Sequence, residues 1–498
     1  MSSTATARSD RDFISALKSP ERLFINGTWS APLSRQTRSL VSPGSGRRFI
    51  TVAEAGAEDV NRAVAAAREA FDAGPWPRMT PAERAPYLSR LGREIAARAE
   101  AFAGLQASEM GALFQMCVQF VPYFAGVFDI YSGMAATFPF IEKHQPAIGG
   151  TGYLVAEPVG VCAAIVPWNG PLMLACWKLA PALLAGCTVI LKASPEAPCT
   201  LIALAEAIDA AGLPKGVVNV ITADREVSEL LVRHPGVDKV SFTGSTVAGK
   251  KIGAICAERV ARCTLELGGK SPAILLDDYS VDTFCDQIAP VATVLSGQVC
   301  AALTRVIVPR AKQQRVLDAL AARFSAVKVG DPFDPSSVMG PLASSRQCTR
   351  VKTYIEKGKA DGARLITGGA TPVGLNPSFY VEPTLFGDVD NKTTIAREEI
   401  FGPVLSVIPA DSEEQAIAMA NDNELGLASA VFTNDSERAF RVARRLRSGT
   451  VGHNGYKSDF TIAFGGFKQS GIGREGGVPG LRAYLELKTV LLDGPIDI

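Results

Sequence analysis

The chain has 498 residues, of which 47% are apolar and 20% charged, and its formal net charge is +1. This length is too great for a single hydrophobic core and predicts two or three domains, while the apolar content excludes an intrinsically disordered chain. Acidic and basic residues are mixed along the chain without a basic stripe or an acidic tail. This distribution disfavours nucleic acid and anionic membranes as partners.

The ten cysteines are scattered and form no C-x-x-C pair, and the chain has only three histidines. A zinc site or a disulfide framework is therefore not expected. Reduced thiols in the cytoplasm are expected instead. The N-terminal residues 1–12 lack the apolar core of a signal peptide. The apolar run 172–191 is interrupted by a lysine, a proline and a glycine, and it predicts a helix followed by a strand, not a membrane span.

The first third of the chain predicts helices packed on a sheet and contains no chemical motif. A strand running into a turn is expected at 23–29 and a second strand at 39–45. An amphipathic helix follows over 57–71, and a capping box that begins at Thr80 predicts a longer helix to residue 98. Further helical sequence extends to about residue 137.

From residue 150 the pattern changes to alternating strands and helices. A strand at 151–158 precedes a series of short elements, and its expected strands are 159–166, 188–191, 217–221 and 239–242, separated by helices at 172–184, 200–211 and 227–234. This spacing predicts a parallel sheet with right-handed crossovers, which binds nucleotides beyond the carboxyl ends of its strands.

A glycine- and hydroxyl-rich turn follows the strand that ends at Phe242. Gly244, Ser245 and Gly249 lie where the next helix begins, so their backbone N–H groups suit a phosphate. The alternative is a simple N-cap, because the turn is not a full G-x-G-x-x-G motif.

A second α/β region is expected from 271 to about 451. It begins with a strand at 273–276 and contains helices at 312–325, 345–359 and 413–420. The tail 485–492 alternates as a strand does, and a terminal strand needs a pairing partner.

Cys300 is the candidate nucleophile. It lies between the apolar run 288–295 and the predicted strand 301–308, with Gly297 three residues upstream, so its thiol is expected at a bend. The alternative is a small core residue, which most free cysteines are.

Several ordered motifs together resemble the aldehyde dehydrogenase superfamily over about residues 20 to 490. The matching segments are Pro167-Trp168-Asn169, Trp177-Lys178-Leu179-Ala180-Pro181, Lys192, Phe242-Thr243-Gly244-Ser245-Thr246, Leu265-Glu266-Leu267-Gly268-Gly269-Lys270, Gly297-Gln298-Val299-Cys300, Glu398-Glu399-Ile400-Phe401-Gly402-Pro403 and Phe464-Gly465-Gly466-Phe467-Lys468.

The resemblance implies a catalytic role for five residues. Cys300 would form a thiohemiacetal and then a thioester, with the Asn169 amide and the Cys300 N–H holding the oxyanion. Glu266 would be the general base, and Lys178 and Glu475 would relay its protons. From the residues alone, Asn169 also suits a turn and Glu266 a surface ion pair, but the apolar neighbours of Glu266 favour a raised pKa.

The resemblance also implies that NAD or NADP is the cofactor. The residues it places at that site are Val166, Pro167, Trp168, Lys192, Ser194, Glu196, Phe242, Gly244, Ser245, Gly249, Leu267, Gly268, Glu399 and Phe401. Many NAD-preferring members have a glutamate three residues after the lysine, whereas this chain has Pro195 there and Glu196 one residue later. NADP is therefore expected to be tolerated.

The substrate-facing residues carried over from the family are uncharged: Gly170, Met173, Trp177, Val299, Ala301 and Phe460. They predict an open apolar pocket for aliphatic or aromatic aldehydes, although Asp459 at the pocket mouth would favour a cationic substrate. The frequent asparagine of the family's Asn-x-Gly-Gln motif is Leu295 here.

The expected architecture is an α/β, aldehyde dehydrogenase-like fold. A Rossmann-like dinucleotide-binding domain would comprise 1–137 and 158–270, a catalytic α/β domain 271–470, and a small β bridging and oligomerisation region 138–157 and 471–498. The resemblance implies a homodimer or homotetramer. The alternatives are a CoA-acylating enzyme, which the presence of Glu266 disfavours, and a non-catalytic protein on the same fold.

Overall fold

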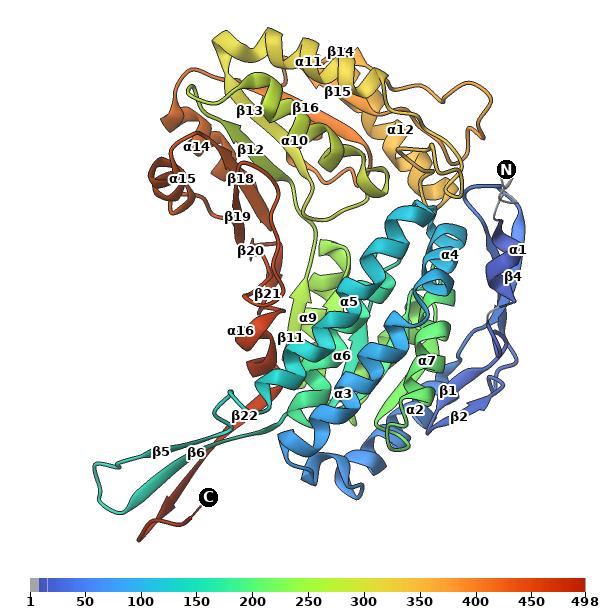
Figure 1. Cartoon of the computed structure of the whole chain (residues 1–498), viewed down its shortest axis with the longest axis vertical. Helices are drawn as coiled ribbons and strands as arrows, with labels where there is room; N and C mark the ends of the chain where they lie inside the picture. The colour runs from blue at the N-terminus through green and yellow to red at the C-terminus, as the bar shows by residue number, and fades with distance from the viewer. Residues whose placement is uncertain (1–8, 16, 498) are drawn as a thin grey trace, which may run out of the picture.

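The computed structural model describes residues 9–15 and 17–497 and has an α/β architecture built on two large sheets at opposite ends of the molecule (Figure 1). A slender three-stranded sheet projects from the end that holds the first sheet (Figure 1). The helices between the two ends belong mostly to the first half of the chain.

The first sheet has eight strands, and its five central strands are parallel. In sheet order they are β2 (Thr28–Ser30), β1 (Leu23–Ile25), β9 (Val218–Thr222), β8 (Thr188–Ala193), β7 (Val161–Ile165), β10 (Lys239–Thr243), β11 (Arg262–Glu266) and β21 (Gly471–Ile472). The strands β2, β1 and β21 run antiparallel to their neighbours. The predicted parallel sheet is therefore confirmed, with antiparallel strands added at both edges.

Helices cover both faces of this sheet, which is why its central strands are apolar throughout. On β7, Cys162 and Ala164 face one core while Val161, Ala163 and Ile165 face the other. The first core contains α3 (Pro81–Ala96), α4 (Ala99–Met110), α5 (Phe114–Met134), α6 (Pro171–Ala185) and α7 (Cys199–Ala210). The second contains α2 (Ala57–Asp72), α8 (Arg225–Arg233) and α9 (Thr246–Glu258).

Several helix starts follow from local sequence. The Thr80 hydroxyl accepts from the Glu83 N–H and the Glu83 carboxylate accepts from the Thr80 N–H, so the predicted capping box is confirmed. This helix ends at Ala96, and α4 begins at Ala99, where one helix to residue 98 was expected. After α6, Gly186 adopts a left-handed conformation (φ 97°) and β8 follows, as the apolar run 172–191 predicts.

The second sheet has seven strands, and all except β14 are parallel. In order they are β14 (Arg364–Thr367), β15 (Thr384–Gly387), β16 (Val404–Ala410), β13 (Leu303–Pro309), β12 (Ser271–Leu275), β18 (Ala428–Phe432) and β19 (Thr450–His453). One face packs on α10 (Val281–Thr293) and α11 (Gln313–Ser325), and the other packs on α12 (Ser345–Ala360), α14 (Glu413–Asn421) and α15 (Ser436–Ala443).

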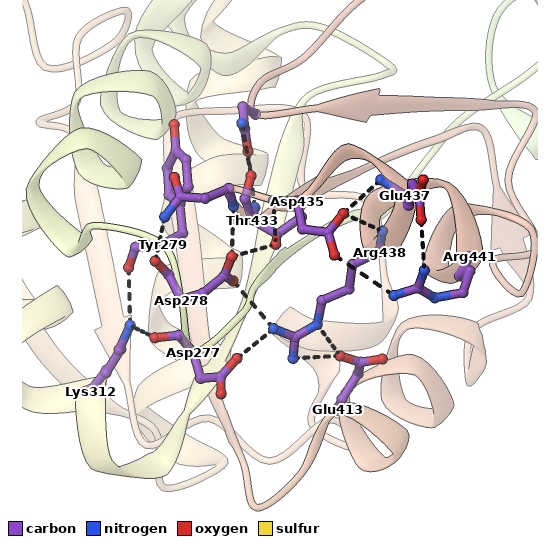
Figure 2. A network of polar contacts seen from close by, with 12 residues as sticks. Asp277, Asp278, Tyr279, Lys312, Glu413, Thr433, Asp435, Glu437, Arg438 and Arg441 are labelled. Carbon is purple, nitrogen blue, oxygen red and sulfur yellow. Dashed lines mark hydrogen bonds and ion pairs between the residues drawn. The ribbon is translucent and has the colours of Figure 1, made fainter.

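The carboxyl ends of β12 and β18 are joined by a network of ion pairs (Figure 2). Arg438 on α15 contacts Asp277 at 2.7 Å, Asp278 at 3.4 Å and Glu413 at 2.7 Å. Asp278 also accepts hydrogen bonds from the Thr433 hydroxyl and the Asn434 N–H, at 2.7 and 2.8 Å. The polar groups at this edge of the second sheet therefore satisfy one another.

The three-stranded sheet joins distant parts of the chain. The hairpin of β5 (Ile141–His144) and β6 (Thr151–Pro158) pairs with the C-terminal strand β22 (Leu485–Leu492), and β6 and β22 match over eight residue pairs. In residues 9–15 and 17–497 no helix is long and apolar enough to cross a bilayer.

The remaining elements are short. The strand predicted at 39–45 is β3 (Thr37–Val41). It pairs with β4 (Arg48–Ala53), a strand that the sequence did not predict. These elements are α1 (Asp10–Ile14), β3 (Thr37–Val41), β4 (Arg48–Ala53), η1 (Trp76–Arg78), η2 (Val294–Gly297), η3 (Arg310–Lys312), α13 (Thr394–Arg397), β17 (Leu425–Gly426), β20 (Phe467–Lys468) and α16 (Gly477–Arg482).

Candidate active site

A cavity of about 1250 Å³, the central hollow, lies between the carboxyl edge of the first sheet and the amino edge of the second. From the first sheet it is lined by Asn169 after β7, Ser245 after β10 and Gly268 after β11. From the second it is lined by Cys300 before β13 and Phe401 before β16. The carboxyl edge of the first sheet and the amino edge of the second sheet thus both border the central hollow.

Cys300 follows a turn whose backbone is left-handed at three successive residues. Leu295, Ser296 and Gly297 have φ of 49°, 56° and 71°. The Ser296 hydroxyl donates to the carbonyls of Gly340 at 2.7 Å and Pro341 at 3.0 Å, which holds the turn against the segment 340–341. Asparagine tolerates a positive φ better than leucine, so the Leu295 departure from the family motif costs backbone strain.

The Cys300 thiol is half-buried and lines the hollow. Burial raises the pKa of the Cys300 thiol to about 12, and the carboxylates of Glu399 and Glu266 add to this. The N–H groups of Ala301 and of Cys300 itself act in the opposite direction. The resting thiol is therefore protonated at neutral pH, and positive charge entering the hollow would make its ionisation easier.

Asn169 is fixed beside this turn. Its side-chain Nδ2 donates to the backbone carbonyl of Gln298 at 2.9 Å, two residues before the thiol. A side-chain amide has two N–H donors, so one anchors the residue and the second is available in the hollow.

Glu266 ends β11 and is only 3% exposed, so it is not the surface ion-pair residue that was one alternative. Neither of its carboxylate oxygens has a hydrogen-bond partner among the described residues. Burial holds the pKa of Glu266 well above its usual value, and the nearby Glu475 carboxylate raises it further, while Lys178 and Arg474 oppose this. A buried, unpaired carboxyl of this kind suits proton transfer.

Lys178 and Glu475 form a fully buried ion pair behind Glu266. The Lys178 Nζ lies 2.5 Å from the Glu475 Oε1, and the Ser241 hydroxyl contacts both groups, at 3.2 and 3.3 Å. Neither Lys178 nor Glu475 lines the hollow. They are positioned to act on Glu266 through the interior.

The cofactor candidates divide into two groups. Eight line the hollow: Pro167, Trp168, Gly244, Ser245, Leu267, Gly268, Glu399 and Phe401. The other six are not among its lining residues: Val166, Lys192, Ser194, Glu196, Phe242 and Gly249. Of these six, Glu196 reaches the wall indirectly, because its carboxylate pairs at 2.7 Å with the lining residue Arg346.

The edge near Ser245 fits a dinucleotide. Ser245 caps α9, a helix of 13 residues, by accepting from the Ala248 N–H at 3.3 Å, which leaves the helix's positive end at the hollow. At Gly268 a Cβ atom would collide with the Glu399 carboxylate. Burial raises the pKa of Glu399 to about 7, and the Gly269 N–H donates to it at 3.3 Å. The backbone N–H groups at the start of α9 can therefore donate to phosphates, and the Glu399 carboxylate can accept from a ribose hydroxyl.

All six substrate-facing candidates line the hollow, namely Gly170, Met173, Trp177, Val299, Ala301 and Phe460. Asp459 does not line it; this carboxylate is exposed and accepts from the Thr461 N–H and hydroxyl, at 2.8 and 2.7 Å. Burial raises the pKa of the lining residue Tyr123, and the charge of Asp459 raises it further.

The sequence analysis missed the contribution of α5. Phe120, Tyr123 and Phe124 line the hollow, and the Tyr123 ring lies 5.6 Å from that of Phe460. The helices of this region pack on the first sheet as predicted, and α5 in addition lines the hollow, which the sequence did not predict. The available signal was the aromatic spacing i, i+3, i+4, which marks one face of a helix.

The fold and the site together define a two-sheet α/β protein with a cysteine, an amide and a buried carboxyl around one large hollow. A family model with the description "Aldehyde dehydrogenase family" matches residues 29–490 of this chain. The chain belongs to the aldehyde dehydrogenase family.

Among similar proteins, geranial dehydrogenase from Castellaniella defragrans is 41% identical over 476 residues, which cover 95% of this chain and 99% of that protein. A betaine aldehyde dehydrogenase from Rhizobium leguminosarum is 40% identical, with 95% of this chain and 98% of that protein covered.

Two crystal structures are similar over nearly the whole chain. An aldehyde dehydrogenase from Mycobacterium tuberculosis, complexed with NAD+, has a TM-score of 0.92 and 42% identity, with 95% of this chain and 98% of that chain covered. A mutant of aldehyde dehydrogenase C from Pseudomonas syringae, complexed with NAD+ and octanal, has a TM-score of 0.91 and 39% identity, with 96% and 98% covered.

Proposed function

We propose that this chain oxidises a neutral aldehyde to its carboxylic acid with NAD+ or NADP+. The single observation that carries the proposal is the convergence of Cys300, Asn169 and Glu266 on the central hollow. Each of the three provides one element of acyl chemistry: a nucleophile, an oxyanion donor and a base. The family membership and the NAD+ complexes of similar structures support it.

In the first half of the reaction, the ionised Cys300 Sγ adds to the aldehyde carbon and the carbonyl oxygen becomes an oxyanion. The free N–H of the Asn169 amide and the Cys300 N–H donate to this oxygen. Because the other N–H of Asn169 is held by the Gln298 carbonyl, the amide is oriented before substrate arrives. When bound, the dinucleotide supplies a hydride acceptor, and loss of hydride leaves a thioester on Cys300.

In the second half, Glu266 takes a proton from water, and the resulting hydroxide attacks the thioester carbon. The C–S bond breaks, the acid leaves and the Cys300 thiolate is regenerated. A raised pKa makes Glu266 a stronger base than an ordinary carboxylate once it is ionised. The buried pair of Lys178 and Glu475 then carries the proton away from Glu266.

For the cofactor, we propose that Ser245 and the Gly244–Gly249 turn bind the pyrophosphate and that Glu399 binds the nicotinamide-side ribose. Lys192, Ser194 and Glu196 lie at the adenosine ribose in this proposal. Phe401 and Trp168, whose rings are 5.4 Å apart and nearly perpendicular, flank the nicotinamide.

A neutral aliphatic or aromatic aldehyde is the proposed substrate. The lining residues from α4, α5, α6 and the segment 456–464 include no charged side chain. They include seven aromatic side chains, which favour an apolar substrate: Phe120, Tyr123, Phe124, Trp177, Tyr456, Phe460 and Phe464. Octanal in one similar structure and geranial in the name of one relative are consistent with this choice.

The domain division proposed is a dinucleotide-binding domain of 1–137 and 158–270, a catalytic domain of 271–470 and a bridging region of 138–157 and 471–498. The strand β22 is one edge of the three-stranded sheet, which leaves its outer side open for pairing. We propose a homodimer or homotetramer that pairs this edge with another subunit, in the cytoplasm.

The test measures NAD(P)H formation with hexanal, benzaldehyde and an amino-aldehyde for the wild type and for Cys300→Ser. Substitution of the nucleophile should lower kcat by at least about 10³-fold, because a serine hydroxyl is a much weaker nucleophile than a thiolate. Cys263→Ser is the matched control, since Cys263 is also half-buried and lies outside the hollow. Full activity of the Cys300 variant would reject the mechanism, and a higher kcat/KM for the amino-aldehyde would reject the neutral substrate.

A further inference from the structure

A second cavity adjoins the central hollow and has no role in the reaction proposed above. This cavity, the side pocket, has a volume of about 430 Å³ and lies between the first turn of α5, the helix α10, the end of α11 and the segment 338–340. Three side chains line both cavities, namely Met116, Val294 and Leu295. The hollow and the side pocket therefore meet at these three residues, beside the turn that carries Cys300.

Met116 continues the apolar face of α5 from the hollow to the side pocket. Met116, Phe120 and Tyr123 follow the spacing i, i+4, i+7, which places them on one face of the helix. Phe120 and Tyr123 line the hollow and are 46% and 53% exposed. Leu113 and Val338 line only the side pocket, and Val338 is itself 53% exposed. Apolar side chains therefore lead from the aromatic wall of the hollow into the side pocket.

Leu295 lies at the junction of the two cavities with a backbone that disfavours it. Its φ is 49°, a left-handed conformation that leucine rarely adopts and asparagine tolerates better. The next residue, Ser296, donates its hydroxyl to the carbonyl of Gly340, which also lines the side pocket. The turn before Cys300 is thus one wall of the side pocket. Backbone strain is typically kept where function requires it, and here it holds an apolar side chain between the two cavities.

The polar side chains that line the side pocket are already engaged with other groups of the protein. Asp286 and Arg323 form an ion pair at 2.7 Å. Arg323 also donates to two backbone carbonyls, at 3.0 and 3.1 Å. The Thr293 hydroxyl donates to a carbonyl of its own helix at 3.1 Å. A hydrocarbon therefore suits this cavity better than a charged ligand, because a hydrocarbon needs no polar partner.

This inference rests on the proposed function, in which Cys300 attacks an aldehyde carbon in the hollow. We propose that the side pocket receives the far end of the substrate's hydrocarbon chain, which passes from the hollow between Met116 and Leu295. The substrate class is thereby narrowed to long-chain aliphatic aldehydes. The continuity of the two cavities supports this occupant, and a volume of about 430 Å³ lies in the range of small-molecule sites. Leu295 is then a specificity-determining residue.

The experiment measures kcat/KM with NAD+ for unbranched aldehydes from butanal to decanal, in the full chain. In the wild type, kcat/KM should keep rising beyond hexanal by up to about fourfold per carbon, the value of burying one methylene group. Val338→Asp places a carboxylate at the exposed rim of the side pocket. It should lower the ratio of kcat/KM for decanal to that for butanal by about tenfold, mainly through KM, because the chain end would lie beside a charge.

Leu295→Asn should lower the same ratio, because a polar side chain would then lie where the chain passes between the cavities. Since asparagine tolerates a positive φ better than leucine, added backbone strain is no explanation for this fall. The ratio of the two aldehydes also separates the inference from a general loss of activity, which would lower both values of kcat/KM equally.

Val373→Asp is the matched control, because Val373 is a fully exposed valine that lines neither cavity. Its ratio of kcat/KM for decanal to butanal should equal that of the wild type. A wild-type kcat/KM that stays level beyond hexanal, or an unchanged ratio in Val338→Asp or Leu295→Asn, would overturn the inference and leave the proposed function intact. If no aldehyde of the series produced NADH, the proposed function itself would fail.

Discussion

The two large sheets of this protein are both mainly parallel, but the polar groups at their carboxyl edges differ in whether they are paired. At the first edge, Glu266 ends β11 with neither oxygen paired within the part of the chain that the structure describes, and the α9 N-terminus at Ser245 opens into the hollow. At the second edge, Asp278 follows β12 with bonds to Thr433, Asn434 and Arg438. Ligands bind at the carboxyl ends of parallel strands in open α/β sheets, and of these two acids Glu266 lines the hollow whereas Asp278 does not.

The difference lies in which polar groups the fold satisfies internally. An unpaired buried carboxyl costs free energy and persists where chemistry requires it, whereas a paired network contributes to stability alone. Figure 2 shows Arg438 on α15 reaching the acids that follow β12, so the loops at the second edge are joined by side chains. The second sheet instead contributes to the site through its amino edge, where Cys300 precedes β13.

The largest effect should come from removing the unpaired carboxyl. Glu266→Gln is expected to lower steady-state turnover by about 10²- to 10⁴-fold, because the thioester loses its general base. The initial burst of NADH in a stopped-flow experiment should remain, since addition and hydride loss depend on Cys300. Asp278→Asn at the other edge should leave turnover unchanged. Equal losses in both variants would contradict the distinction between the two edges.

A smaller effect concerns the ionisation of the thiol. Because the pKa of Cys300 is raised to about 12, the thiolate fraction at pH 7 to 9 should grow about tenfold per pH unit. The rate of alkylation by iodoacetamide should follow that slope in the protein without dinucleotide, and Cys300→Ser gives the background rate. Turnover should also rise with pH, since the raised pKa of Glu266 likewise requires loss of a proton. An alkylation rate that is level above pH 7 would mean that the thiol is already ionised there.

The smallest effect is expected at the second edge. Arg438→Met should lower the free energy of unfolding in urea by roughly 1 to 2 kcal/mol, because three partly exposed ion pairs are lost. Its kcat/KM should stay at the wild-type value. Arg441→Met, on the same helix but with contacts no closer than 3.8 Å, should change stability less. If Arg438→Met lost activity while its free energy of unfolding stayed at the wild-type value, the carboxyl edge of the second sheet would have a functional role, contrary to this prediction.

Much of the fold could be predicted because it depends on local patterns. The strands β7 to β10 and the helices between them were expected from apolar periodicity, and Thr80, Gly186 and Ser245 mark helix ends by side-chain or backbone chemistry alone. The antiparallel edge strand β21 was not expected, because two residues carry no periodicity and pair only after residues about 200 positions apart meet.

By itself, the sequence determined the residue types that the chemistry needs and their order along the chain: a cysteine after a glycine turn, a glutamate before Gly268, and glycines at a helix start. The tertiary structure decided which of these groups are left unpaired and which distant side chains join them. The pairing of Glu196 with Arg346, the aromatic wall from α5 and the burial of Glu266 all depend on segments that meet only in the folded chain. The physical reason is that burial and pairing set the free energy of a charged or polar group, and neither can be read from its neighbours in sequence.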